Sequence, residues 1–310
     1  MGTGSIGERV FGVKTLALDS PPARIYPPPM QHGQASVTAL GAAGHRAAHQ
    51  VLEQGVVFAD PLALPILGQD ADEAIARAKE QPERRPLRFF IAMRSRFAED
   101  MARRAMADGV RQILILGAGL DTFAYRIEPA ERLKVFELDH PATQRDKRRR
   151  LAEAGILERE HVAYVAHDFE GGGMTATLAA AGLKPSERTF VLWLGVTPYL
   201  TENAVLATLG ELAELPGGVE VVFDYTNPSH TIEETAARTF HRAMAESVAA
   251  RGEPFRCYFE TDDLHASARR LGFSEIEDLD RAALVSRYLP HLPVTPRPGP
   301  GGHVVRMARR

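Results

Sequence analysis

Two short segments of this 310-residue chain combine the residue types that bind a nucleoside. Four apolar residues at 113–116 lead directly into a glycine-rich turn, formed by Gly117, Ala118 and Gly119. A strand buried on both faces opens into a nucleotide-binding turn in this way. The segment KVFELD reads as the next strand, and it ends in Asp139, twenty residues after the turn. An acid at that place can accept hydrogen bonds from both hydroxyls of a ribose.

The turn lacks the third glycine of a dinucleotide site, and this difference favours another nucleoside. Dinucleotide folds follow G-x-G-x-x-G, whereas this chain has Thr122 at the third position and Asp121 before it. The Asp121 carboxylate would repel a diphosphate, but it suits a ligand with a sulfonium and an ammonium group. S-adenosylmethionine is such a ligand. A nicotinamide-dependent oxidoreductase stays open as an alternative, because the glycine turn and the ribose acid alone would serve it.

Further motifs around these two segments resemble one known family. GAGLDT is followed by AYR, then by FELDHP with Thr143, Gln144 and Lys147, and then by HDF at 167–169. In combination they are similar to the leucine carboxyl methyltransferase-like family of class I S-adenosylmethionine-dependent methyltransferases, in its bacterial branch. The resemblance extends from about Ser36 to the C-terminus. It implies a Rossmann-like α/β fold with a seven-stranded sheet that is parallel except for its last strand.

From Gln112 onward the chain alternates strand and helix, as in a doubly wound sheet. The predicted strands are 112–117, 134–139, 161–166, 189–194, 220–225, 274–280 and 303–308. Right-handed crossovers would bring the carboxyl ends of the first strands to one edge of the sheet. Gly117, Asp139 and Asp168 should therefore converge there, although they lie far apart in sequence.

Three regions complete the predicted organisation. Residues 1–34 are rich in glycine and proline and should form a flexible N-terminal arm. Residues 35–110 should form an N-terminal helical cap, in which Ser36 caps the first helix and Val37, Leu40 and Val51 fall near one apolar face. The Rossmann-like methyltransferase core should occupy residues 111–310. Its helical insertion at about 227–260, after the fifth strand, is placed to act as a lid. The alternative is an outer helix that extends the core, and the periodicity of the segment is compatible with either.

Arg94 lies inside the apolar arc of the last predicted helix of the cap. A cation inside an apolar arc needs an anion. In the resemblance, the arginine at this position lies against the carboxylate of the methionine moiety of the cofactor. A structural ion pair is the alternative, and Arg96 is the fallback for the ligand contact.

The adenosine part of the cofactor has its own candidate residues. Asp168 could accept a hydrogen bond from the adenine amino group while the backbone amide of Phe169 donates to a ring nitrogen, or Asp168 could cap a turn instead. Asp139 could likewise cap the helix that opens at Pro141. Glu137, two residues earlier on the same strand face, is the alternative ribose acceptor.

The methyl acceptor should enter at the fourth strand, VLWLGVTPYLT. Trp193, Tyr199 and the turn at 195–198 would form an amphipathic wall suited to an organic molecule. The chain departs from the family at Leu194, where Glu is common, and at Phe123, where Arg is usual. Both departures make the predicted site less charged and favour a more apolar acceptor than a peptide C-terminus.

Methyl transfer from a sulfonium needs few catalytic groups, because the enzyme chiefly holds an oxygen in line and excludes water. A carboxylate acceptor is ionised at pH 7 and needs no base, whereas a phenol, with a pKa of about 10, needs one. The candidates for that base are Tyr199, Asp224 and Tyr225. The predicted reaction is O-methylation, carboxyl-directed, of a small or medium organic metabolite. The alternative is a regulator that binds the cofactor without turnover, or one that methylates a partner protein.

Composition argues against several other classes of protein. The net charge of −3 gives no field for nucleic acid or an anionic membrane. Cys257 is the only cysteine, so no intrachain disulfide is possible and a cytoplasmic location is expected. The chain shows no hydrolase triad order, no zinc motif and no apolar run of the ~18 residues that a membrane span requires. The sequence leaves the oligomeric state open.

Overall fold

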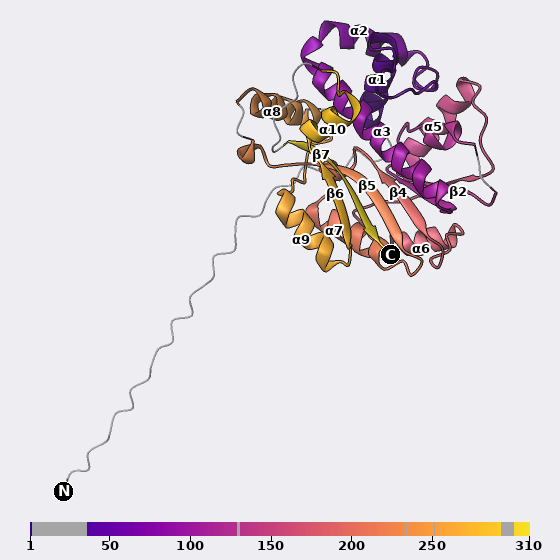
Figure 1. Cartoon of the computed structure of the whole chain (residues 1–310), viewed down its shortest axis with the longest axis vertical. Coiled ribbons are helices and arrows are strands. Elements are labelled where there is room, and N and C mark those ends of the chain that lie inside the picture. Colours follow the sequence, from indigo (N-terminus) through magenta and orange to yellow (C-terminus); the bar gives the residue numbers. More distant parts are fainter. Residues whose placement is uncertain (2–35, 129–130, 233–234, 251, 293–300) are drawn as a thin grey trace.

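The computed structural model describes residues 36–128, 131–232, 235–250, 252–292 and 301–310, together with Met1. The arm predicted for residues 1–34 therefore lies outside the described residues, Met1 excepted. Figure 1 shows one twisted sheet with helices on both of its faces. Within the described part of the chain, every helix is too short or too polar to cross a lipid bilayer.

The sheet has seven strands in the order β3-β2-β1-β4-β5-β7-β6. Strand β7 runs antiparallel to both of its neighbours, and the other pairings are parallel. This confirms the predicted fold class, and each predicted strand end is within one residue of the observed one. The strands are β1 Gln112–Leu116, β2 Lys134–Asp139, β3 Val162–Ala166, β4 Thr189–Trp193, β5 Val219–Thr226, β6 Glu275–Leu279 and β7 Gly302–Arg309.

Helices cover both faces of the sheet because its central strands are apolar on both sides. In β1, Ile113 and Ile115 pack into one hydrophobic cluster, and Leu114 and Leu116 into the other. The first cluster includes residues of α1 Val37–Leu52, α2 Asp70–Glu80, α3 Arg85–Ala107, α4 Phe123–Arg126, α5 Pro141–Glu153 and α10 Arg281–Tyr288. The second includes residues of α6 Met174–Ala180, α7 Glu202–Ala213 and α9 Thr261–Arg270.

Helix α1 begins where the sequence predicts, since the Ser36 side chain accepts a hydrogen bond from Ala39 N. Its predicted apolar face is wrong in part, because Val37 and Val51 are 42% and 44% exposed. Small residues are buried instead, and they let helices approach closely: a Cβ on Gly44 would lie 3.1 Å from Ala74 of α2. The helices before β1 share a hydrophobic cluster with the sheet. The domain boundary at 110/111 stays a prediction.

Between β5 and α9 the described chain forms a short 3-10 helix, Ser229–Thr231, and helix α8, Thr235–Ala249. An extended segment then returns to the sheet, where Phe259 N donates a hydrogen bond to Thr226 O over 3.1 Å. Two further 3-10 helices, Pro82–Arg84 and Thr197–Tyr199, precede α3 and α7. The lid role of this insertion stays a prediction.

Candidate active site

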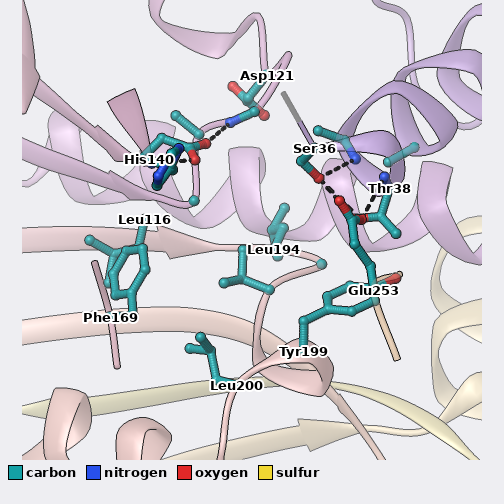
Figure 2. A pocket seen from close by; sticks show the side chains of 18 of the residues that line it. Ser36, Thr38, Leu116, Asp121, His140, Phe169, Leu194, Tyr199, Leu200 and Glu253 are labelled. Atoms are coloured by element: carbon teal, nitrogen blue, oxygen red, sulfur yellow. Dashed lines mark hydrogen bonds between the residues drawn. The ribbon is translucent and has the colours of Figure 1, made fainter. Parts of the chain in front are cut away.

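A cavity opens at the carboxyl ends of β1, β2 and β4, where the strand order reverses. Ligands of open α/β sheets bind at such a switch point. The predicted convergence of Gly117, Asp139 and Asp168 is confirmed, because all three line this cavity. Figure 2 shows the cavity with Phe169 and His140 at one end and Glu253 at the other.

The glycine turn adopts a left-handed backbone conformation at both of its glycines. Gly117 and Gly119 have φ of +61° and +46°, in the left-handed region that favours glycine. A Cβ on Gly117 would lie 2.3 Å from Cγ2 of Val196, and one on Gly119 would lie 3.0 Å from Cβ of Ala39. The close approach at these glycines is therefore made to this chain's own side chains. Both glycines and Ala118 line the cavity.

Asp139 joins the turn to the end of β2. Its Oδ2 accepts a hydrogen bond from Gly119 N over 2.6 Å, and its Oδ1 accepts one from His140 N over 2.6 Å. Burial raises the pKa of the Asp139 carboxyl, although the two backbone donors oppose that effect. The alternative role as a helix cap is not realised, because the His140 side chain caps α5 by accepting from Ala142 N.

Glu137, the alternative ribose acceptor, is not among the residues that line the cavity. Its Oε2 lies 2.7 Å from Nζ of Lys147, and both side chains are only 1% exposed. Glu137 lies two positions before Asp139, deeper in the sheet, and Lys147 of helix α5 covers it. Burial raises the pKa of Glu137, and the Lys147 ammonium opposes that effect. This correction leaves Asp139 as the acid of β2 that faces the cavity.

Asp168 and Phe169 both line the cavity just after the end of β3, and their predicted contact with an adenine stays a prediction. Phe169 is buried and lines the cavity, with its ring stacked on Trp193 at 6.3 Å between centroids. Asp168 lines the cavity and also caps a turn, because its Oδ1 accepts from Glu170 N over 3.0 Å. Asp121 lines the mouth of the turn, and its Oδ1 accepts from Phe123 N over 2.8 Å.

Arg94 lies in the cavity wall and is ion-paired there. Its Nη1 lies 2.6 Å from Oδ2 of Asp224, whose Oδ1 accepts from Gly195 N over 2.5 Å. The predicted alternative of an ion pair is thus realised, with an acid from β5. The same side chain still faces the cavity, and its buried Nε has no hydrogen-bond partner among the described residues. Contact between Arg94 and a ligand stays a prediction.

The three candidate bases are not brought together. Asp224 is 4% exposed, held by Arg94 and Gly195, and absent from the described lining of the cavity. Tyr225 points to the opposite sheet face, where its hydroxyl donates to Oδ2 of Asp278 over 2.7 Å. Tyr199 lines the cavity, and burial raises its pKa to about 12. Of the three, Tyr199 alone is placed to touch a ligand.

The two departures from the family have different consequences. Leu194 lines the cavity near Tyr199 (Figure 2), so this part of the lining is apolar. Phe123 is fully buried in the first hydrophobic cluster and is absent from the described lining. The expectation that both departures reduce charge in the site is therefore wrong for Phe123, which fills the core beneath the turn.

The sequence analysis missed several residues of the cavity wall. Arg46 of α1 donates to Leu120 O over 2.6 Å and lies 3.4 Å from Oδ2 of Asp60. In the sequence, Arg46 is a cation among the alanines of a helix, and a cation within an apolar helix face is the signal that identified Arg94. Glu253 gives no such local signal, because its partners are more than 200 residues away. The other polar lining residues that were not predicted include Ser36, Thr38, Ser95, His140, Glu170 and Arg256.

Comparisons with known proteins agree with this geometry. The family model for leucine carboxyl methyltransferase matches residues 39–213. YktD of Bacillus subtilis (strain 168), provisionally named as an S-adenosyl-L-methionine-dependent methyltransferase, is 29% identical over 263 residues, which are 76% of this chain and 85% of YktD. A provisionally named methyltransferase of Saccharopolyspora erythraea is 33% identical over 192 residues, 57% of this chain and 63% of that relative.

A solved structure with the same fold is that of a provisionally named methyltransferase from Thermobifida fusca YX. It superposes with a TM-score of 0.56 and covers 90% of this chain and 97% of its own. At 16% sequence identity, this likeness supports the fold alone.

Proposed function

Because the chain belongs to the leucine carboxyl methyltransferase family, and is thus an S-adenosylmethionine-dependent methyltransferase, we propose that it methylates a carboxylate oxygen of a small or medium organic metabolite. One observation carries the proposal. Among the described residues, Tyr199 and Glu253 are the titratable side chains near the proposed acceptor wall, and both are poorly suited to remove a proton. Burial raises the pKa of Tyr199 to about 12. The carboxylate of Glu253 already accepts three hydrogen bonds. A carboxylate acceptor needs no base.

The residues present fit the cofactor in three places. Phe169 and Asp168 would hold the adenine, by ring contact and by a carboxylate acceptor for its amino group. Asp139 would accept from the ribose hydroxyls. The guanidinium of Arg94, which lines the cavity, would donate to the carboxylate of the methionine moiety, beside the glycine turn. When bound, S-adenosylmethionine supplies an electrophilic methyl group.

The chain's own residues would then orient the acceptor and exclude water. Leu194 and Leu200 lie near Tyr199 and away from His140 (Figure 2), and together with Val196 they give the cavity an apolar wall. An apolar wall favours an acceptor whose carboxylate is attached to a hydrophobic body. The Tyr199 hydroxyl, neutral at pH 7, can donate a hydrogen bond to an acceptor oxygen.

The test is a screen of carboxylic and phenolic acceptors with S-adenosylmethionine, read as a mass increase of one methyl group in place of a proton. We expect transfer to apolar carboxylic acids, at a rate that is flat between about pH 6 and pH 9 because no base has to ionise. Tyr199→Phe should retain transfer within about tenfold of the wild type, since the phenol acts at most as a donor.

Transfer to phenols alone, or a rate that rises with each pH unit up to about pH 9, would contradict the carboxyl assignment. Binding of S-adenosylmethionine without methylation of any small acceptor would favour the regulator or the protein-directed enzyme instead. Alanine at Leu194 is a matched variant for the wall: it should weaken the binding of apolar acceptors and leave cofactor affinity unchanged.

A further inference from the structure

A short strap of chain, residues 252–256, borders the cavity and contacts both of its sides. Gly252, Glu253, Pro254 and Arg256 all contribute to the cavity wall. On one side Glu253 reaches the first turn of α1. On the other side Nη1 of Arg256 lies 2.8 Å from Oε1 of Glu170, just after β3. The strap therefore bridges two walls that sequence separates by more than a hundred residues.

Glu253 makes the contact with α1 through its carboxylate. Its Oε1 accepts from Val37 N over 2.9 Å, and its Oε2 accepts from Thr38 N over 2.8 Å and from Ser36 Oγ over 3.3 Å. Figure 2 shows the bonds from Ser36 and Thr38 to Glu253, above Tyr199. A carboxylate at a helix N-terminus is stabilised both by the free amide groups and by the helix dipole. These three hydrogen bonds join the strap to helix α1, which forms the opposite wall of the cavity.

The two ends of the strap are attached to different elements of the fold. At the C-terminal end of the strap, Arg256 N and Cys257 N both donate to Pro198 O, over 2.6 and 3.2 Å. Shortly after it, Phe259 N donates to Thr226 O of β5. At the start of the strap, Gly252 is exposed, has φ of +84° and would have no atom within 4 Å of an added Cβ. Glycine at such a position permits large backbone rotations. One end is thus anchored to the body. The other end follows α8, where Gly252 N donates to Ala249 O and Glu253 N to Val248 O, and it reaches α1 through the Glu253 carboxylate.

The strap is also coupled to the acceptor wall. The Phe255 ring packs edge-on against Tyr199 at 5.3 Å between centroids. Glu253, Ser36 and Thr38 remain partly accessible to solvent or exposed, so water can replace their mutual hydrogen bonds. Hydrogen bonds that are partly accessible to solvent, like those of Glu253 with α1, break in local openings that cost little free energy.

We propose that Glu253 is a positioning residue that latches the strap over the cofactor cavity. Release of its carboxylate from α1 lets the strap swing about Gly252, and the cofactor and its demethylated product exchange through that released state. Closure of the latch holds Phe255 against Tyr199 and so completes the acceptor wall. This inference depends on the position of the cofactor site and is independent of the acceptor that is methylated.

The test uses the full chain and S-adenosylhomocysteine, with Trp193 as an intrinsic probe. Trp193 is the only tryptophan, is buried and stacks on Phe169 of the cavity, so its fluorescence should report occupancy. In stopped-flow experiments Glu253→Gln should raise the dissociation rate about tenfold, equivalent to about 1.4 kcal/mol. Asp280→Asn is the matched control: Asp280 accepts from Ala283 N at the start of α10 and does not line the cavity, so the rate should stay unchanged.

Equal dissociation rates for Glu253→Gln and the wild type would overturn the proposal and leave Glu253 a helix cap only. A second measurement needs no variant: hydrogen exchange of the Val37 and Thr38 amides in the wild-type protein should slow at saturating S-adenosylhomocysteine. Exchange that is unaffected by the ligand would also overturn it. Both readouts require binding alone, so a failure of the carboxyl assignment would leave them intact.

Discussion

The substitution Gly117→Ala tests whether the cavity depends on the glycine turn as its geometry indicates. The free energy of unfolding should fall for two separable reasons. Alanine at φ +61° costs about 1–2 kcal/mol, because its Cβ crowds the following carbonyl. The same Cβ would lie 2.3 Å from Cγ2 of Val196, an overlap that forces a shift costing about 1–3 kcal/mol. The expected loss is therefore about 2–5 kcal/mol.

Urea unfolding of four proteins separates the two contributions: wild type, Gly117→Ala, Val196→Ala and the double variant. Removal of the Val196 methyl groups relieves the overlap, since the remaining Val196 Cβ lies 3.3 Å from the added atom. The double variant should therefore regain the overlap contribution and keep the backbone cost, giving a favourable coupling of about 1–3 kcal/mol. Affinity for S-adenosylhomocysteine should fall in Gly117→Ala. A loss of stability below about 0.5 kcal/mol, or strictly additive effects, would refute the reasoning.

Three further perturbations test other parts of the site. Asp139→Asn should lower the affinity for S-adenosylhomocysteine about tenfold or more in calorimetric titration, because charge-assisted hydrogen bonds to ribose are lost; an unchanged affinity would contradict the ribose assignment. Arg94→Met should lower the free energy of unfolding, measured by urea denaturation, by about 3–5 kcal/mol, because it leaves the buried Asp224 without its cation. The control Arg96→Met, on the exposed side of the same helix, should change this free energy by less than about 0.5 kcal/mol. Burial alone would raise the pKa of Asp278, but hydrogen bonds from neighbouring side chains outweigh burial and lower that pKa. The ionised Asp278 carboxylate therefore stabilises the fold above about pH 4, and this stabilisation is lost as the pH falls further. The stability difference between wild type and Asp278→Asn should shrink between pH 7 and pH 3, and a constant difference would contradict this sign.

The strands could be predicted closely because their signal is local. Short apolar runs bounded by glycine and polar residues leave few alternatives for strands buried on both faces. The convergence of Gly117, Asp139 and Asp168 also followed, since parallel strands joined by right-handed crossovers have their carboxyl ends at one edge. The reversed direction of the last strand came from the family resemblance, because periodicity does not distinguish parallel from antiparallel pairing.

The errors arise where tertiary contacts override a local pattern. Val37 and Val51 are exposed because small residues of α1 allow a closer approach to α2 than branched ones would. Glu137 has the right residue type and strand face, but helix α5 covers it with a lysine. The contact between Glu253 and α1 joins residues 215 apart, so no window of the sequence contains both partners.

The place of β7 in the sheet has a consequence for how the chain is synthesised. Within the described fold, β6 pairs with β7 and with no other strand, and β7 also covers the edge of β5. Neither contact can form until residues 302–309 have left the ribosome. Until then β5 presents an open row of amide and carbonyl groups, which other chains can pair with. Chaperone binding to nascent chains that end before Gly302 should therefore be stronger than binding to those that include β7.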